Sequence, residues 1–276
     1  MIIDFHVHLA AREHLVPASA SFCDSFWGAR GDWDTLLTPE GFDAYLEQEG
    51  VDWAVGLPEI SPLVTGVTTN EYVWERFRGS RRLVLFANLN PWLTPRLDRE
   101  IERLAGLGFR GVKLYPTYQH FYPNEPRLYP LYGACQALGL PVMAHTGSSI
   151  FPGAKLKYGD PLHLDDVAAD FPDLSLLLVH GGRGFWYERA EFLAQLHPNV
   201  YLEVSGLPPR NLPAYFPSLE RLHRKVVFGS DWPGNPGIRH NVEAIAALPL
   251  SDQAKAAILG GNAARILKLE GGEEGT

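Results

Sequence analysis

Eight short, apolar, β-rich segments recur along the chain, and this repetition constrains the fold more than any other feature. Several are apolar almost throughout, as expected for parallel strands that are covered on both faces. The segments are IIDFHVH (2–8), DWAVGLP (52–58), RLVLFANL (82–89), RGVKLYP (110–116), LPVMAHT (140–146), LSLLLVHG (174–181), NVYLEVSG (199–206) and KVVFGSDW (225–232).

Helical patterns fill the intervals between these segments. Thr38-Pro39 and Thr94-Pro95 each place a capping threonine before a proline in a first helical turn, and Gly50 and Gly108 end the two helices. Further helices are predicted at 70–79, 126–138, 163–171, 185–196, 212–223, 238–247, 251–259 and 262–269.

This alternation predicts an α/β fold of the (β/α)8 TIM-barrel type. A doubly wound open sheet is the competing architecture, but no glycine-rich phosphate-binding turn follows the first strand. We expect one barrel domain over residues 1–270, with active-site loops at about 10–38 and 115–130, and a disordered tail at 271–276. Residues 18–37 are the candidate lid.

Composition narrows the range of partners. The formal charge is −8 with no lysine or arginine run, which argues against a nucleic-acid or anionic-membrane surface. The two cysteines, Cys23 and Cys135, are far apart in sequence, so we expect free thiols in a reducing compartment. Without a signal peptide or an apolar membrane span, the expected location is the cytoplasm, and base rates favour a homodimer.

Polar residues gather at the carboxyl ends of the predicted strands, where barrel enzymes carry their chemistry. Alternation along a strand predicts that Asp4, His6 and His8 point into the barrel while Ile3, Phe5 and Val7 point outward. It likewise pairs Met143 with His145 and Leu178 with His180 on inward faces. The residues expected at this rim are His6, His8, Lys113, His145, His180 and Asp231.

Four histidines and an aspartate at one rim favour a metal site over chance placement. Neutral imidazoles and a carboxylate suit a borderline divalent ion such as Zn²⁺, with one coordination position left for water or substrate. We therefore predict one divalent ion, with zinc as the first choice and manganese, cobalt or iron as compatible ions.

The order of these residues resembles the amidohydrolase superfamily, which has H-x-H, His, His and Asp on strands one, five, six and eight. The local sequence around these residues is similar to that of the amidohydrolase-2 branch, which includes the aminocarboxymuconate-semialdehyde decarboxylase-like proteins. The matching stretches, with gaps mainly at 10–50 and 117–135, are IIDFHVHL, GFRGVKLYP, PVMAHTG, DPLHLDDVAADFPDLSLLLVHGG, FLAQLHPNVYLEVSG, VVFGSDWP and ILGGNAARIL.

The resemblance implies a role for each rim residue. It makes His6, His8, His145 and Asp231 the ligands of one metal ion, and it implies that His180 orients or deprotonates the water on that ion. Asp231 would also take a proton from this water, and a purely supporting His180 is the alternative. In binuclear branches a lysine like Lys113 becomes a carbamate that bridges two metals. An unmodified lysine that binds a substrate carboxylate fits the amidohydrolase-2 sequence pattern better.

Aromatic residues follow several strands and suggest a flat or ring-containing substrate. We expect Tyr115 and Trp232 to contact it, with Arg183 or Lys113 paired with a carboxylate. The first functional hypothesis is a metal-dependent hydrolase of a small, carboxylate-bearing lactone, ester or amide. The alternatives are a non-oxidative decarboxylase of an aromatic or unsaturated acid, and a barrel that binds a metal without turnover. Glu203, in the seventh strand, has no assigned role.

Overall fold

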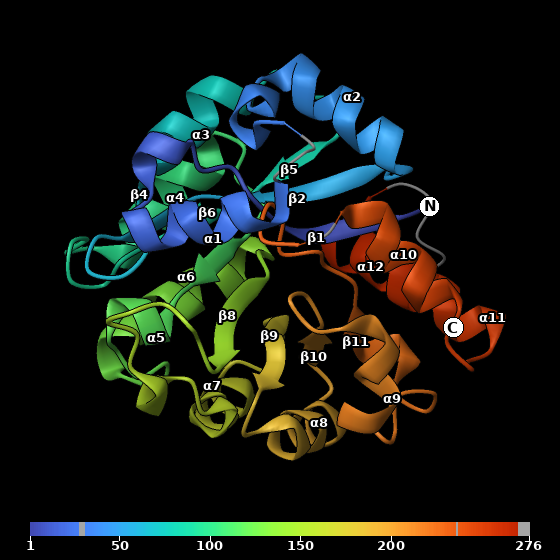
Figure 1. Cartoon of the computed structure of the whole chain (residues 1–276). Helices are drawn as coiled ribbons and strands as arrows, with labels where there is room; N and C mark the ends of the chain where they lie inside the picture. The colour runs from blue at the N-terminus through green and yellow to red at the C-terminus, as the bar shows by residue number, and fades with distance from the viewer. Residues whose placement is uncertain (28–30, 236, 270–276) are drawn as a thin grey trace.

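All eight predicted strands form one parallel ring in the structure, a computed structural model that describes residues 1–27, 31–235 and 237–269. The third strand is split in two at Phe86. In Figure 1 the strands surround the centre of the molecule. They are β1 (Ile3–His8), β2 (Trp53–Leu57), β5 (Leu83–Leu85), β6 (Ala87–Asn88), β7 (Val112–Leu114), β8 (Val142–Gly147), β9 (Leu176–Arg183), β10 (Val200–Glu203) and β11 (Val226–Val227).

Backbone hydrogen bonds close the ring between its first and last strands. Phe5 N donates to Phe228 O at 3.0 Å, and Asp231 N donates to His6 O at 3.0 Å. His8 N adds a bond to Trp232 O at 2.9 Å. A closed ring of parallel strands is the predicted (β/α)8 barrel, and it excludes the open doubly wound sheet.

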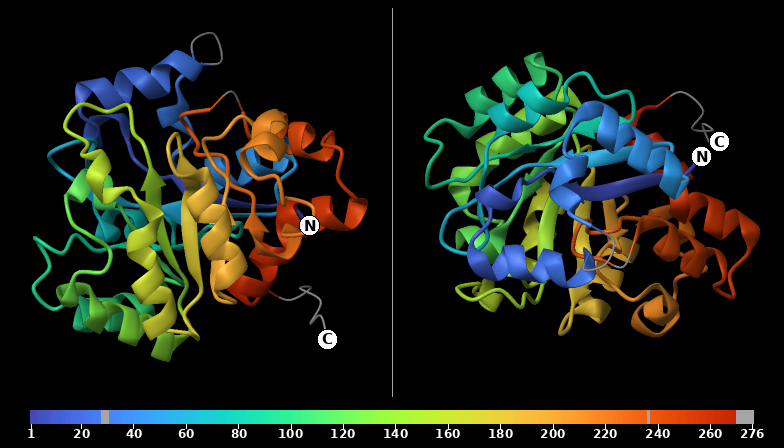
Figure 2. Two further views of the ribbon diagram at one scale, coloured as in Figure 1. Left: turned by 90° about the horizontal axis from the view of Figure 1, so that it is seen from below. Right: turned by 45° about the horizontal axis from the view of Figure 1, so that its top comes forward.

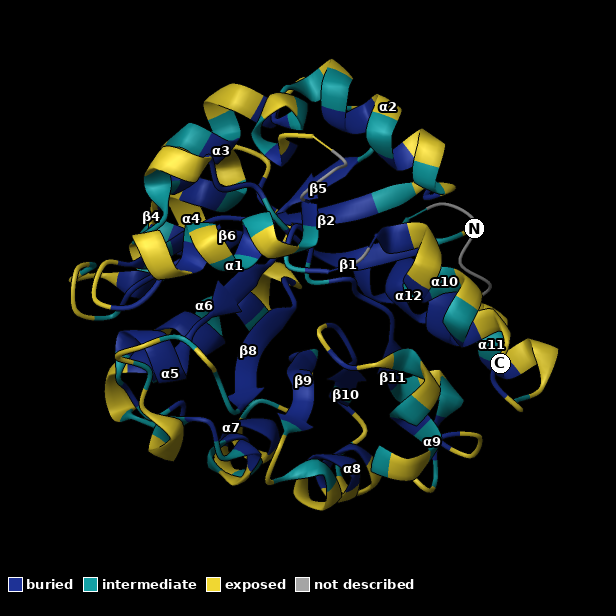
Figure 3. Cartoon of the chain, in the orientation of Figure 1, coloured by how far each residue is buried: buried dark blue, intermediate teal, exposed yellow. Residues whose placement is uncertain are grey.

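Helices surround the barrel, and their exposed residues lie mainly on the outer surface (Figure 3). The left view of Figure 2 shows α1 at the end towards which the strand arrows point. The helices are α1 (Pro17–Trp27), α2 (Pro39–Glu49), α3 (Asn70–Phe77), α4 (Leu97–Gly106), α5 (Pro116–Gln119), α6 (Tyr129–Leu138), α7 (Asp165–Asp170), α8 (Tyr187–Leu196), α9 (Leu212–Tyr215), α10 (Ile238–Ala246), α11 (Asp252–Ala256) and α12 (Asn262–Leu267).

The core has two layers. The larger layer joins one face of the strands to the surrounding helices. The smaller layer joins residues of the opposite strand faces to α12, which closes the amino-terminal end of the barrel. The inner layer includes Ile3, Phe5, Val55, Leu57, Val84, Phe86, Met143, Leu177, Val179 and Val227, together with Ala263, Ala264, Ile266 and Leu267 of α12.

Two strands depart from the predicted alternation. Ile3 and Phe5 lie in the inner layer and Val7 in the outer layer, because the register of β1 shifts between Asp4 and Val7. The prediction that Ile3 and Phe5 point outward was therefore wrong. Leu178 was also misplaced, because it lies in the outer layer. His180 nevertheless lines the cavity, since its backbone has a φ of 63° and breaks the alternation of β9.

Several local predictions need correction. Residues 212–223 form an α-helix only at Leu212–Tyr215, and Thr94 does not cap α4, which begins at Leu97 after Arg96. An antiparallel hairpin of β3 (Glu59–Ser61) and β4 (Gly66–Thr68), absent from the prediction, follows β2. The candidate lid contains all of α1 except Pro17, but its residues 28–30 lie outside the described part of the chain, as does the expected tail at 271–276.

Two further predictions concern cysteines and membranes. Cys23 and Cys135 are both free, as expected, and both are buried. Within the described ranges, every helix is too short or too polar to cross a lipid bilayer.

Candidate metal centre

The carboxyl-terminal rim of the barrel contains a cavity of about 320 Å³. Residues from distant parts of the chain line it, among them the predicted rim set His6, His8, Lys113, His145, His180 and Asp231. Arg183 and Glu59 add opposite charges to the wall. The strands therefore deliver all six predicted rim residues to one cavity, the volume of which suits a small molecule.

Three potential ligand atoms converge at the base of this cavity. Asp231 Oδ1 lies 3.3 Å from His6 Nε2 and 3.2 Å from His8 Nε2. The two Nε2 atoms are themselves 3.2 Å apart. Ligands about 2.1 Å from a tetrahedral ion are separated by roughly 3.4 Å, so these three atoms are spaced as a shared ion requires.

The Nδ1 atoms of His6 and His8 lie on the far side of each ring from Asp231. His6 Nδ1 faces a serine hydroxyl and a glutamate, and His8 Nδ1 faces a glutamate. His6 Nδ1 lies 2.8 Å from Ser205 Oγ and 3.3 Å from Glu203 Oε2. His8 Nδ1 lies 3.7 Å from Glu59 Oε2. If Nδ1 carries the proton in both rings, both Nε2 atoms present lone pairs towards Asp231, and none of the three acceptors has a hydrogen to share with the other two. A cation between them satisfies all three, so the residues fit a metal ion.

His145 stands beside this three-atom group. Its Nε2 is buried and has no hydrogen-bond partner in the described chain, and its ring centroid is 4.7 Å from that of His180. Burial lowers the pKa of His145 well below its ordinary value, which keeps the imidazole neutral and able to bind a cation. An unpartnered buried nitrogen at this position is consistent with a further ligand, although His145 is not one of the three converging residues.

His180 and Asp231 both have left-handed backbones, with φ of 63° and 67°. His180 Nδ1 lies 2.8 Å from Ser205 O, which can only accept, so Nδ1 carries the proton and Nε2 is an acceptor. Burial lowers the pKa of His180 well below its ordinary value. For Asp231 burial acts to raise the pKa, but the neighbouring His6, His180 and His8 outweigh burial, and the net result is a pKa well below the ordinary value. Strained conformations at two adjacent polar groups are typical of functional sites.

Two cationic side chains border the group. Lys113 is fully buried, with Nζ 3.3 Å from His6 Nε2 and 4.6 Å from the centre of the Tyr115 ring. Burial lowers the pKa of Lys113 and raises that of Glu203, and their opposite charges counteract both shifts. Arg183 Nη1 lies 4.0 Å from Asp231 Oδ2, and the guanidinium also donates to Ser148 O at 3.0 Å.

Two predicted substrate contacts lie outside the cavity wall. Trp232 is fully buried against Trp27, Trp33 and Phe42, because it points away from the side on which Asp231 reaches the cavity. Tyr115 is 1% exposed and donates its hydroxyl to Pro58 O at 3.0 Å. Neither residue lines the cavity, so both expectations are withdrawn. The aromatic residues on the wall are instead Phe22, Tyr118 and Phe151.

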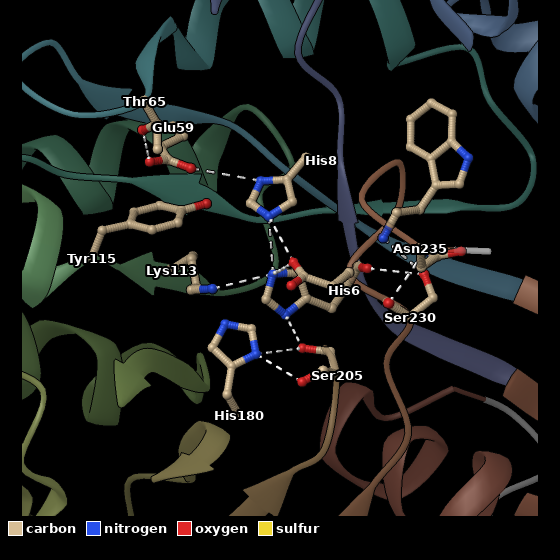
Figure 4. Close-up of polar contacts among 12 residues, drawn as sticks. His6, His8, Glu59, Thr65, Lys113, Tyr115, His180, Ser205, Ser230 and Asn235 are labelled. Carbon is tan, nitrogen blue, oxygen red and sulfur yellow. Dashed lines mark hydrogen bonds and ion pairs between the residues drawn. The ribbon is translucent and has the colours of Figure 1, made fainter. Parts of the chain in front are cut away.

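Sequence reasoning missed three polar residues of the site. Glu203, left without a role, contacts His6 from β10, and Ser205 lies between His6 and His180 (Figure 4). Glu59 reaches His8 from the hairpin that was not predicted. A charged residue within an otherwise apolar strand was the available signal for Glu203, whereas nothing in the sequence distinguishes Ser205 or Glu59.

A closed (β/α)8 barrel with histidines and an aspartate at its carboxyl-terminal rim is the architecture of a TIM-barrel enzyme of the amidohydrolase type. The amidohydrolase family model matches residues 3–269. The chain therefore belongs to the amidohydrolase-2 family.

Named relatives differ in activity. The chain is 29% identical over 206 residues to a 2-keto-4-carboxy-3-hexenedioate hydratase of Sphingobium sp. (strain NBRC 103272 / SYK-6), a match covering 60% of this chain. It is 27% identical over 193 residues, or 62% of this chain, to a dihydroorotase of Mycosarcoma maydis. These matches span 59% and 44% of the relatives' own lengths.

Solved structures share the fold along nearly the whole chain. An uncharacterized TIM-barrel protein of Bordetella bronchiseptica has a TM-score of 0.77 and 24% identity, covering 97% of this chain and 98% of that one. A probable 2-pyrone-4,6-dicarboxylic acid hydrolase of Acinetobacter baumannii scores 0.67 at 17% identity, covering 97% and 99%. A manganese-bound 5-carboxyvanillate decarboxylase of Novosphingobium aromaticivorans scores 0.68 at 19% identity, covering 98% and 96%.

Proposed function

We propose that the chain is a metal-dependent hydrolase that acts on a small, carboxylate-bearing lactone, ester or amide. The main support for this proposal is that His6 Nε2, His8 Nε2 and Asp231 Oδ1 lie within 3.3 Å of one another in a cavity that Arg183 also lines. Three electron-pair donors with no donor hydrogen between them form a cation site. A guanidinium beside that site is suited to a substrate carboxylate.

The proposed ion is held by His6, His8 and Asp231, with His145 as a fourth ligand. Zinc is the first choice, and manganese, which the decarboxylase of Novosphingobium aromaticivorans binds, is compatible with the same donors. Such an ion, when bound, polarises a carbonyl group and makes water more acidic. We retain Lys113 as an unmodified amine and expect one ion per chain.

The protein's own residues then have separate roles. Asp231 accepts a proton from the attacking water and returns it to the leaving oxygen or nitrogen. His180, protonated at Nδ1 by its bond to Ser205 O, accepts a hydrogen bond from that water through Nε2. Arg183 and Lys113 hold the substrate carboxylate, so that the carbonyl carbon lies against the water.

Decarboxylation is the second candidate, and the aromatic wall of the cavity favours it. Phe22, Tyr118 and Phe151 would accommodate a flat, unsaturated ring. In that reaction Asp231 would take a proton from water and pass it to the ring carbon as the carboxylate leaves as carbon dioxide, and the hydroxide that remains would be released to solvent. The 5-carboxyvanillate decarboxylase, with a similar fold, gives this alternative its substrate class.

The test combines metal analysis with two substrate panels. We expect close to one divalent ion per purified chain, and acid release from carboxylate-bearing lactones, esters or amides. Carbon dioxide release from aromatic or unsaturated acids, without hydrolysis, would instead establish the decarboxylase. Bound metal with no turnover on either panel would identify a binding protein.

Asp231→Asn provides the mechanistic check. We expect it to abolish turnover with the fold intact, because an amide cannot accept the proton. The matched control is Asp165→Asn, which alters an aspartate–histidine pair outside the cavity lining, with Asp165 Oδ1 2.7 Å from His197 Nε2. Near-normal activity in Asp231→Asn would remove this residue from the mechanism.

A further inference from the structure

Ser205 contacts the imidazoles of both His6 and His180 from a single buried position. Its hydroxyl oxygen lies 2.8 Å from Glu203 Oε2, 2.8 Å from His6 Nδ1 and 3.1 Å from His180 Nδ1. Ser205 and Glu203 are both fully buried at the end of β10. Figure 4 shows Ser205 between the two rings. One residue thus connects a proposed metal ligand with the histidine proposed to hold the water.

The hydrogen-bond geometry restricts where the protons lie. Ser205 N donates to Glu203 Oε1 at 2.9 Å and the Ser205 hydroxyl donates to Oε2 at 2.8 Å, so the side chain of Glu203 accepts from the backbone through one oxygen and from the hydroxyl through the other. The hydroxyl has only one hydrogen. Once that hydrogen points to Glu203, Ser205 Oγ can only accept from an imidazole, and His6 must carry its proton on Nδ1.

Lys113 supports the same assignment from the other side of the ring. Its Nζ, which as an ammonium can only donate, lies 3.3 Å from His6 Nε2. His6 Nε2 must then be the acceptor, which again leaves the proton on Nδ1. His180 is fixed separately, because its Nδ1 donates to the backbone oxygen of Ser205 at 2.8 Å.

We propose that Glu203 and Ser205 are positioning residues that fix the tautomers of His6 and His180, so that Nε2 of both rings carries a lone pair, for the metal in His6 and for the water in His180. This inference rests on the proposed metal-dependent function. Glu203 contacts His6 directly, at 3.3 Å from Nδ1, and also through the hydroxyl of Ser205, but it has no contact with His180 among the described residues. Ser205 contacts His6 through its hydroxyl, and His180 both through its carbonyl at 2.8 Å and, more weakly, through its hydroxyl at 3.1 Å. The two imidazoles can therefore be perturbed separately.

Glu203→Gln is the sharpest variant, because the amide offers one acceptor where the carboxylate offers two. In metal-free protein, long-range ¹H–¹⁵N spectra of the histidine rings report each tautomer directly. We expect wild-type His6 and His180 to be protonated at Nδ1. In Glu203→Gln, His6 should become a mixture while His180 stays unchanged, and Zn²⁺ affinity measured by calorimetry should fall by roughly 10- to 100-fold.

Ser205→Ala tests the hydroxyl, because it removes Oγ and keeps the carbonyl that holds His180. We expect His6 to lose its single tautomer and Zn²⁺ affinity to fall, and we expect Ser205→Thr to restore both. Glu191→Gln is the control: Glu191 is a buried glutamate on α8 that accepts from Ser218 N at 2.7 Å. Its Zn²⁺ affinity should match that of the wild type.

The outcomes separate this inference from the proposed function. A wild-type His6 or His180 protonated at Nε2 would overturn the inference even if no variant folds. Wild-type tautomer and Zn²⁺ affinity in both Glu203→Gln and Ser205→Ala would overturn it as well. A wild-type protein with Nδ1 protons that takes up no metal would instead contradict the metal-dependent function, and the tautomer assignment would stand.

Discussion

Gly206 lies where the site leaves no room for a side chain. Its φ is 64°, and a β-carbon there would be 2.7 Å from both Arg183 Nη1 and Asp231 Oδ2. Glycine meets both requirements at once, since it tolerates the left-handed region and leaves space for the two charged groups. The approach of Arg183 to Asp231 thus depends on a residue that contributes no functional group.

Gly206→Ala should therefore impair function beyond its effect on stability. The left-handed backbone alone costs about 1 kcal/mol with a β-carbon present. Gly139→Ala is the control, because its φ is also 64° and its β-carbon would meet only the end of the flexible Lys268 side chain, at 2.6 Å. We expect similar losses in urea unfolding but reduced Zn²⁺ affinity only in Gly206→Ala. Equal Zn²⁺ affinity in both would show that the close packing is unimportant.

Asp4 connects the two strands that carry the ligands. Its Oδ1 accepts from His6 N at 3.0 Å and from Ser230 N at 2.8 Å, while the buried Oδ2 has no hydrogen-bond partner among the residues that the structure describes. Burial raises the pKa of Asp4 from 3.8 to about 7. The folded chain then binds more protons than the unfolded chain between these values, so its stability falls as the pH rises through this range.

Asp4→Asn should remove this pH dependence, because the amide keeps the accepting oxygen and cannot ionise. In metal-free protein we expect the stability of the wild type relative to Asp4→Asn to decrease from pH 3.8 to about 7 by more than about 1 kcal/mol. Urea unfolding across this range measures the difference. A constant difference would mean that Asp4 has an ordinary pKa.

The sequence predicted individual site residues unevenly. His6, His8, His145, His180 and Asp231 follow from their places at strand ends, and the structure brings all five to one cavity. Trp232 was misjudged because proximity in sequence to a rim residue does not determine which way a side chain points. Ser205 and Glu59 could not be found, because their importance depends on which imidazole they meet in three dimensions.

At the scale of elements, two threonines with the same sequence context behave differently. Thr38 caps α2 by accepting from Gly41 N at 3.0 Å. Thr94 also precedes a proline, but α4 begins only at Leu97, after Arg96, which has no capping hydrogen bond. A threonine–proline pair therefore marks the start of a helix only where the residues directly after the proline are themselves helical, as they are after Pro39 and are not after Pro95.

Thr38→Ala should destabilise the protein by about 1 kcal/mol, the usual effect of removing an N-cap side chain. Thr94→Ala is the matched variant and should have almost no effect, because its hydroxyl caps no helix. Chemical unfolding of both variants measures this difference. Equal destabilisation would show that Thr94 contributes through a contact other than capping.

The eight strands were predictable because apolar runs bounded by turns are a strong local signal. Their irregularities were not, because no local sequence pattern indicates the register shift in β1 or the left-handed backbone of His180. The β3–β4 hairpin escaped prediction because its strands are only three residues each. These departures lie at or beside the candidate site, where local regularity is most often sacrificed.

At the scale of the whole molecule, ring closure creates the site. His8 and Asp231, 223 positions apart, meet because the first and last strands of the barrel are neighbours. Three electron-rich atoms this close repel one another, and a cation between them would relieve the repulsion. Metal binding and the stability of the closed barrel should therefore be linked. The homodimer expected from base rates stays a prediction.

Added Zn²⁺ should raise the unfolding midpoint, because an ion that binds only the folded chain stabilises it by mass action. At a free concentration of 100 times Kd the gain is about 2.7 kcal/mol. His145→Ala removes the unpartnered Nε2 beside the three-atom group, and we expect most of this gain, the bound metal and activity to be lost together. His163→Ala is the control, since His163 packs against Tyr122 and does not line the cavity. An unchanged Zn²⁺-dependent shift in His145→Ala would limit the ligands to His6, His8 and Asp231.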